Sequence, residues 1–170
     1  MESTDTVVPY DPSWPARFVL LRNTIDAALG GTIHTTEHVG STAVPGLASK
    51  PVIDIDVVVA DANDVDKAVI RLERAGYRHQ GDLGIPGRQA FESPSHMPAH
   101  HLYVVVSGNR AHRDHVDLRD YLRRHPEKAA RYGRAKESLA QHLSTNRPAY
   151  FAGKKPLIDQ LLSAARECTT

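Results

Sequence analysis

Residues 52–59 place two aspartates inside a run of valine and isoleucine, and this segment constrains the fold more than any other. The order Val-Ile-Asp-Ile-Asp-Val-Val-Val predicts a buried strand, because β-branched residues favour strands. Side chains alternate along a strand, so Asp54 and Asp56 share one face while the isoleucines point into the core. Buried unpaired carboxylates are costly. The two aspartates therefore lie at an exposed end, pair with cations or bind a metal.

The surrounding segments predict an α/β (α+β) fold, with a mixed β-sheet of four to five strands and flanking helices. Asp11 is expected to cap the first helix and Pro12 to take its first position. The expected elements are a helix over 12–29, strands over 32–39 and 52–59, a helix over 63–75, a short strand over 77–80, and a hairpin of 88–92 with 101–107.

The last third of the chain changes to a helical pattern from residue 112 onward. Residues 127–145 and 149–167 look amphipathic, and Pro126, Pro148 and Pro156 are expected to punctuate the helices. With 170 residues, one domain is the default. We therefore expect a single domain over 1–170, with a core over about 10–107 and C-terminal helices over about 112–168.

Charge and cysteine content exclude several classes of protein. Lysine and arginine number 21 against 20 acidic residues, which gives no cationic field for general nucleic-acid binding. Cys168 is the only cysteine, so neither an intrachain disulfide nor a zinc cluster is expected. No apolar run suits a membrane span, and the first residues do not resemble a signal peptide. A cytoplasmic protein without membrane association is expected.

Gly40-Ser41, followed after twelve intervening residues by Asp54-Ile55-Asp56, is the unit that suggests chemistry. Gly40 allows a phosphate to approach the backbone, and Ser41 can donate its hydroxyl and open a short helix whose free amides favour an anion. Aspartates about 7 Å apart along a strand can converge on Mg²⁺. Such a site suits in-line attack on a nucleotide α-phosphate. Taken alone, however, Gly-Ser is also a common turn.

These residues also resemble a known family. The segment His38-Val-Gly-Ser-Thr-Ala-Val-Pro-Gly-Leu-Ala-Ser-Lys-Pro-Val-Ile-Asp-Ile-Asp56 is similar to the signature of the GrpB-like family, a branch of the nucleotidyltransferase superfamily with the polymerase-β type core. The resemblance implies a nucleotidyltransferase-like sheet with functional positions at Gly40, Ser41, Asp54 and Asp56. It continues through Tyr10-Asp-Pro-Ser-Trp14, Gly84-Ile-Pro-Gly-Arg88, His100-His-Leu, Leu118-Arg-Asp-Tyr-Leu-Arg-Arg-His-Pro126 and Gly153-Lys154.

The sequence departs from the superfamily at the third carboxylate. Active nucleotidyltransferases usually place an acid on a neighbouring strand, and His101-Leu-Tyr-Val-Val-Val106 contains none. His101 can fill that position as a metal ligand or proton acceptor, or it is simply a hydrogen-bonded histidine of the sheet. Glu92, on the preceding strand, is the other candidate metal ligand.

Basic residues near these segments are candidate phosphate anchors. Lys50 precedes the acidic strand, Arg88 follows Pro86-Gly87, and Lys154 lies in the last helical segment. Arginine can grip a phosphate with two parallel bonds, and lysine supplies a compact charge. The alternative for each is a solvated surface side chain.

The sequence thus predicts a Mg²⁺-dependent nucleotidyltransferase that transfers a nucleoside monophosphate from a nucleoside triphosphate (NTP) to a small-molecule acceptor. Asp54, Asp56 and His101 are the candidate catalytic residues. One alternative is a catalytically silent nucleotide- or coenzyme-binding module that assists a partner enzyme, since the family is similar to a domain fused to dephospho-coenzyme A kinase. A third hypothesis is a metal-dependent hydrolase that uses the same aspartates to cleave a phosphoester with water.

Overall fold

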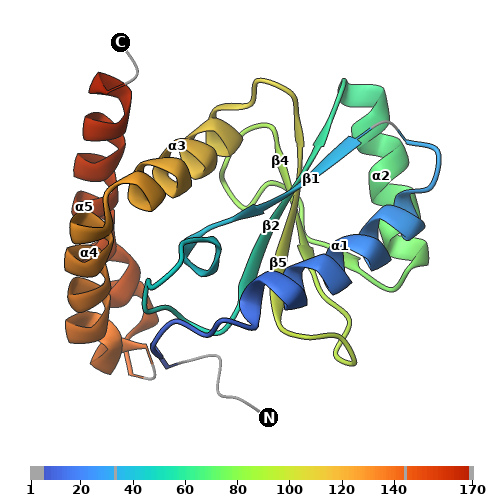
Figure 1. The fold of residues 1–170 in the computed structure, drawn as a ribbon. Coiled ribbons are helices and arrows are strands. Elements are labelled where there is room, and N and C mark those ends of the chain that lie inside the picture. Colours follow the sequence, from blue (N-terminus) through green and yellow to red (C-terminus); the bar gives the residue numbers. More distant parts are fainter. Residues whose placement is uncertain (1–5, 33, 144, 169–170) are drawn as a thin grey trace.

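A five-stranded mixed sheet forms the centre of the molecule (Figure 1). This computed structural model describes residues 6–32, 34–143 and 145–168. The strand order is β1-β2-β5-β4-β3; β2 and β5 are parallel and the other pairs are antiparallel. The mixed α+β fold predicted from the sequence is confirmed. The strands are β1 (His34–Val39), β2 (Ile53–Val59), β3 (Arg78–His79), β4 (Arg88–Glu92) and β5 (His100–Val106).

The register of the central strands decides which residues share a face. Asp54 of β2 lies opposite His101 of β5, and Asp56 lies opposite Tyr103. On the other side of β2, Val39 of β1 pairs with Asp54. Because side chains directly opposite one another project to the same face, Asp54, Asp56, His101 and Tyr103 share one face of the sheet, with the apolar Val39 beside Asp54.

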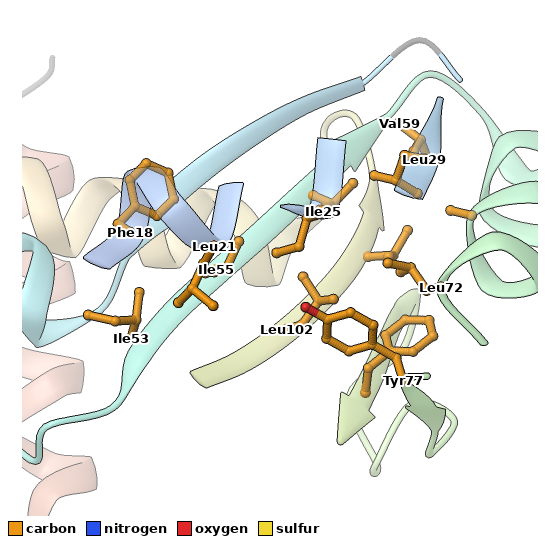
Figure 2. Packing of buried hydrophobic residues seen from close by; sticks show 14 of the residues in the cluster. Phe18, Leu21, Ile25, Leu29, Ile53, Ile55, Val59, Leu72, Tyr77 and Leu102 are labelled. Atoms are coloured by element: carbon orange, nitrogen blue, oxygen red, sulfur yellow. The ribbon is translucent and has the colours of Figure 1, made fainter. Parts of the chain in front are cut away.

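The opposite face of the sheet carries the main hydrophobic core. Helices α1 (Trp14–Leu29) and α2 (Ala62–Arg74) cover this face. Figure 2 shows Leu29 of α1 beside Val59, and Ile25 of α1 over the part of the sheet that carries Ile55 and Leu102. Both of the last two side chains are fully buried, and burial of each contributes about 1.5–3 kcal/mol. This packing holds the central strands in one register.

Three C-terminal helices build a second hydrophobic cluster at one end of the molecule (Figure 1). They are α3 (Arg110–Arg124), α4 (Pro126–Leu139) and α5 (Arg147–Glu167). Val44 and Leu47, which follow β1, pack into this cluster. Two single 3-10 turns, η1 (Ser41–Ala43) and η2 (Ala140–His142), complete the described structure. In the described ranges, every helix is too short or too polar to cross a bilayer.

Several predicted boundaries differ from the structure. The first helix begins at Trp14, with a proline in its first turn, and not at Pro12. The expected cap, Asp11, instead accepts a hydrogen bond from the Ser13 amide at 2.8 Å and pairs with Arg17 at 3.2 Å. Asp11 therefore organises the turn that precedes the helix.

The other differences lie at β1 and in the C-terminal helices. β1 begins at His34, and Ile33 lies outside the described residues. The segment predicted as helical over 127–145 ends as α4 at Leu139 and continues as η2. Pro156 was expected to interrupt the last helix but lies inside α5. Packing of Leu157 and its neighbours on the second cluster holds the helix together across the proline.

Candidate active site

Gly40 ends β1 and brings the backbone against Asp54. Its φ of 72° and ψ of −170° lie in a region that glycine alone adopts readily. A Cβ atom at this position would lie 2.2 Å from Oδ2 of Asp54. Ser41 follows directly and begins the η1 turn. The glycine therefore allows the turn and the carboxylate to occupy adjoining space.

Asp54 is the more accessible of the two strand aspartates. Its side chain is 30% exposed, and its Oδ1 lies 2.8 Å from Nδ1 of His101 on the neighbouring strand. His101 is itself 49% exposed. The adjacent His100 projects to the opposite face, where Nε2 lies 2.9 Å from the hydroxyl of buried Tyr77. The two neighbouring histidines thus lie on opposite faces of the sheet and have different hydrogen-bond partners.

Asp56 is fully buried and bound by two histidines of α3. Nδ1 of His112 and Nδ1 of His115 each lie 2.9 Å from its Oδ2. Burial opposes ionisation of Asp56, but these hydrogen bonds outweigh it and hold the pKa below the ordinary value. Burial likewise opposes protonation of His115, but Asp56 outweighs it and raises the His115 pKa. Oδ1 of Asp56 has no hydrogen-bond partner among the described residues.

Two lysines from the C-terminal helices reach the same region. Lys136 of α4 is 1% exposed, and its Nζ donates a hydrogen bond to Oγ of Ser41 at 2.8 Å. Burial lowers the pKa of Lys136 to about 7. Lys154 of α5 lies with its Nζ 5.0 Å from the ring centroid of Tyr150. Burial also lowers the pKa of Lys154, while the charge of Asp54 opposes that shift.

A cavity of about 190 Å³ is lined by some of these groups, and we call it the first cavity. Gly40, Ser41 and Asp54 line one side. The helices contribute apolar side chains and Lys154 to the other side. The full lining comprises Val39, Gly40, Ser41, Asp54, Tyr103, His115, Leu118, Arg119, Leu122, Tyr132, Lys154 and Ile158. This arrangement offers a charged end for phosphates and an apolar wall for a larger group.

The remaining predicted site residues lie around this cavity or beyond it. Arg88 is 8% exposed and stacks on Tyr103, with Cζ 4.4 Å from the ring centroid. Lys50, Glu92 and His101 line a separate cavity of about 440 Å³, the second cavity. Glu92 forms an ion pair with Arg78. The structure therefore brings Gly40, Ser41, Asp54 and Lys154 together and places Glu92 two strands away from Asp54.

Three residues of this region were missed from the sequence. His112 and His115 are spaced by three at the start of a helix, which places them on one helical face. Lys136 follows Ala129 and Tyr132 at the spacing of the apolar stripe of α4. A lysine within this apolar stripe was the sequence feature that could have indicated a buried lysine.

The carboxylates suit a hard divalent cation only in part. Asp54 and the unpartnered Oδ1 of Asp56 supply oxygen donors, which are the ligands that Mg²⁺ prefers. In the described parts of the chain, no group of three or more His, Cys, Asp or Glu side chains is placed to hold a metal ion. Mg²⁺ commonly binds through one or two carboxylates together with substrate phosphates. These residues fit such a shared site and do not form a complete protein cage.

The amino-acid sequence matches the family described as GrpB protein over residues 5–164. A UPF0157 protein of Pseudomonas aeruginosa is 36% identical over 167 residues, covering 96% of this chain and 68% of that protein. A dephospho-CoA kinase of Mycolicibacterium paratuberculosis is 29% identical over 175 residues, covering 88% of this chain and 43% of the kinase. The chain thus spans less than half of that larger relative.

Similarity to solved structures identifies the type of fold. The conserved protein GrpB from Enterococcus faecalis superposes with a TM-score of 0.80 at 32% identity, covering 93% of this chain and 98% of that chain. The Cid1 poly(U) polymerase, in its MgGTP-bound crystal structure, gives a TM-score of 0.56 at 15% identity over 80% of this chain and 43% of that chain. The sheet and its flanking helices therefore have a nucleotidyltransferase-like fold.

Proposed function

This chain belongs to the GrpB family, and on that premise we propose that it is a magnesium-dependent nucleotidyltransferase. It transfers a nucleoside monophosphate from an NTP to a small acceptor. The observation that carries the proposal is the convergence of Asp54, Ser41 and Lys154 on the first cavity, with buried Lys136 hydrogen-bonded to Ser41 behind it. An anionic chain of phosphates matches these cations, and a metal shared with the phosphates matches the two carboxylates.

Each group of the first cavity has a proposed role in binding the triphosphate. Lys154 neutralises its charge, and Ser41 is held in place by the 2.8 Å hydrogen bond that it accepts from buried Lys136. Leu118 and Ile158 form the apolar wall against which the nucleoside lies. Mg²⁺, held by Asp54, Asp56 and phosphate oxygens, would offset the charge that develops on the leaving pyrophosphate.

The transfer itself is a displacement at the α-phosphorus. An oxygen of the acceptor hydroxyl forms a bond to this phosphorus, and the bond to the bridging oxygen breaks and releases pyrophosphate. The proton of the hydroxyl passes to His101, our candidate proton acceptor. Asp54, 2.8 Å from its Nδ1, fixes the orientation of the imidazole ring.

Calorimetric titration of the four common NTPs with Mg²⁺ tests the proposal. We expect Asp54→Asn to weaken binding at least about tenfold while circular dichroism stays unchanged. Asp159→Asn is the matched control, since Asp159 is 57% exposed on α5 and pairs with Lys155. The NTP that binds is then offered with a panel of small alcohols, and pyrophosphate release is measured. Absence of NTP binding to the wild type, or full turnover by Asp54→Asn, would refute the nucleotidyltransferase.

The relationship to a dephospho-CoA kinase supports a second candidate, a catalytically silent nucleotide- or coenzyme-binding module that assists a partner enzyme. The kinase contains a region similar to 88% of this chain, and that region accounts for 43% of its length. A silent module would bind a nucleotide or coenzyme without releasing pyrophosphate for any acceptor. Steady pyrophosphate release that Asp54→Asn abolishes would decide against this candidate.

A further inference from the structure

Lys136 is a buried lysine that has a hydroxyl for a partner and no counter-ion. Its Nζ lies 2.8 Å from Oγ of Ser41 and 4.7 Å from the ring centroid of Tyr132. Among the described residues, no carboxylate lies within ion-pair distance of this nitrogen. Because a buried charge without a partner is costly, such a group gives up its proton. The surroundings of Lys136 therefore favour a neutral amine.

The charged groups near Lys136 leave this conclusion unchanged. Burial is the main cause of its pKa of about 7, and the charge of Lys154 on α5 acts in the same direction. The charges of Asp54 on β2 and Glu137 on α4 oppose that shift and are outweighed. Above about pH 7 the neutral amine predominates, and its lone pair can accept a proton.

Ser41 lies between this amine and the first cavity. It lines the cavity together with Asp54 and Lys154, whereas Lys136 is absent from the lining. Gly40, with its φ of 72°, makes the turn that places Ser41 there. The amine thus lies behind the serine, and the cavity lies in front of it. A serine that is hydrogen-bonded to a neutral lysine is one of the known arrangements of an activated nucleophile.

We propose that Ser41 and Lys136 form a nucleophile and base pair, through which the protein nucleotidylates its own Ser41 when an NTP is bound and no acceptor is present. The inference rests on the proposed nucleotidyltransferase function and adds a second activity to the same site. Oγ of Ser41 forms a bond to the α-phosphorus, the bond from this phosphorus to the bridging oxygen breaks, and pyrophosphate leaves. The proton of Ser41 passes to Nζ of Lys136. The product is a phosphodiester between Ser41 and the nucleoside.

Diisopropyl fluorophosphate tests the pair without a nucleotide. A serine oxygen displaces fluoride from the phosphorus of this reagent. With the full chain and no Mg²⁺, we expect labelling at Ser41, located by peptide mass spectrometry. Lys136→Met should slow labelling at least about hundredfold, because it removes the general base. Ser138→Ala and Lys128→Met, at exposed positions of α4, should label at the wild-type rate.

The pH profile of labelling separates a base from a merely structural lysine. The wild-type rate should rise as the pH passes about 7, where Lys136 loses its proton, and then level off. Lys136→Met should show no such step, while its circular dichroism stays that of the wild type. A lysine that only supports the fold would leave the profile of the wild type without this step.

Mg²⁺ with ATP, in the absence of an acceptor, tests the transfer. We expect the mass of the intact protein to rise by one adenylyl group, carried by Ser41, and pyrophosphate to be released with it. Ser41→Ala should lose the adduct and Ser138→Ala should keep it. Lys136→Met should also lose the adduct but still bind ATP in calorimetry, since Lys136 does not line the first cavity.

The contrary results are equally specific. No labelling of Ser41 by the fluorophosphate, or an equal rate in Lys136→Met, overturns the nucleophile and base pair. Labelled Ser41 without an adenylyl group after incubation with Mg²⁺ and ATP, or an adenylyl group on another residue, overturns self-nucleotidylation. Pyrophosphate release with an added alcohol then still supports the proposed function. If ATP does not bind the wild type, both the proposed function and self-nucleotidylation fail, and labelling by the fluorophosphate decides on the pair alone.

Discussion

At the scale of single residues, Gly40 brings the backbone against the candidate metal ligand Asp54. A Cβ at Gly40 would lie 2.2 Å from Asp54 Oδ2, whereas a Cβ at Gly46, which has a similar φ of +78°, meets nothing within 4 Å. We predict that Gly40→Ala displaces Asp54 and weakens NTP binding at least about tenfold. Gly46→Ala should keep the affinity. Strain at such φ values costs on the order of 1–3 kcal/mol, so urea denaturation of both variants accompanies the calorimetry.

The buried Lys136 predicts a pH dependence of stability. The unfolded chain keeps this lysine protonated to its ordinary pKa of 10.5, whereas burial lowers the folded-state pKa to about 7. Between these values the unfolded state binds more protons, so the free energy of unfolding rises with pH. The contribution of one group is at most about 1.4 kcal/mol per pH unit.

Lys136→Met should therefore reduce this slope in urea denaturation between pH 7 and pH 9.5. The difference in stability between the variant and the wild type should favour the variant most at pH 7 and shrink as the pH rises. Lys128→Met, at an exposed position of the same helix, is the control. An unchanged slope in Lys136→Met would mean that the lysine is not buried in solution.

At the scale of elements, polar side chains fix α3 on the sheet. Arg119 is 11% exposed at its side chain, and its guanidinium donates to Glu37 of β1 at 2.8 Å and to the carbonyl of His38 at 3.0 Å. Losing these bonds removes a charged donor from Glu37 and from the half-buried carbonyl of His38, which costs about 1–3 kcal/mol. We predict that loss for Arg119→Met, measured by urea denaturation, and a change within about 0.5 kcal/mol for Arg113→Met, since Arg113 is exposed on the same helix.

Local signals explain why most elements could be predicted from the sequence. The alternation in 52–59 is a period-two pattern, so the shared face of Asp54 and Asp56 followed without tertiary information. The start of α2 is also set locally, because the carboxylate of Asp61 accepts a hydrogen bond from the amide of Asp64. The start of α1 was misplaced because Asp11-Pro12 mimics a helix start, whereas the structure uses the next proline.

Only the part of the candidate site that depends on local sequence could be predicted. The groups on the turn and on β2 belong to one short stretch, and the resemblance to a family reinforced them. His112 lies 56 residues from Asp56, and Lys136 lies 95 residues from Ser41. No local sequence pattern predicts which helical positions contact the sheet. Those contacts depend on how the C-terminal helices pack.

At the scale of the whole molecule, the site joins two hydrophobic clusters. The aspartates belong to the sheet over the main core, while Lys136 and Lys154 belong to helices of the second cluster. A bound nucleotide would tie the two parts together. We predict that ATP with Mg²⁺ slows amide hydrogen exchange in α4 and α5 more than in β2, whose amides are already paired on both sides.

Exchange measured by mass spectrometry, with and without the nucleotide, checks this prediction. Lys154→Met should lose most of the added protection in α5, and Lys155→Met, whose ammonium is exposed and pairs with Asp159, should keep it. Added protection confined to α1 and α2, on the opposite face of the sheet, would contradict the placement of the nucleotide.

The two adjacent histidines of β5 stabilise one register of this strand on β2. In the native pairing, His100 meets Tyr77 in the interior while His101 meets Asp54 on the other face. Sliding β5 by one position along β2 would turn His101 toward the core and bring His100 or Leu102 opposite Asp54 in its place. Both histidines lose their partners in a single slip. The doublet therefore favours the native register of the parallel pair β2 and β5. Among the paired strands of this sheet, these two are separated by the longest stretch of chain.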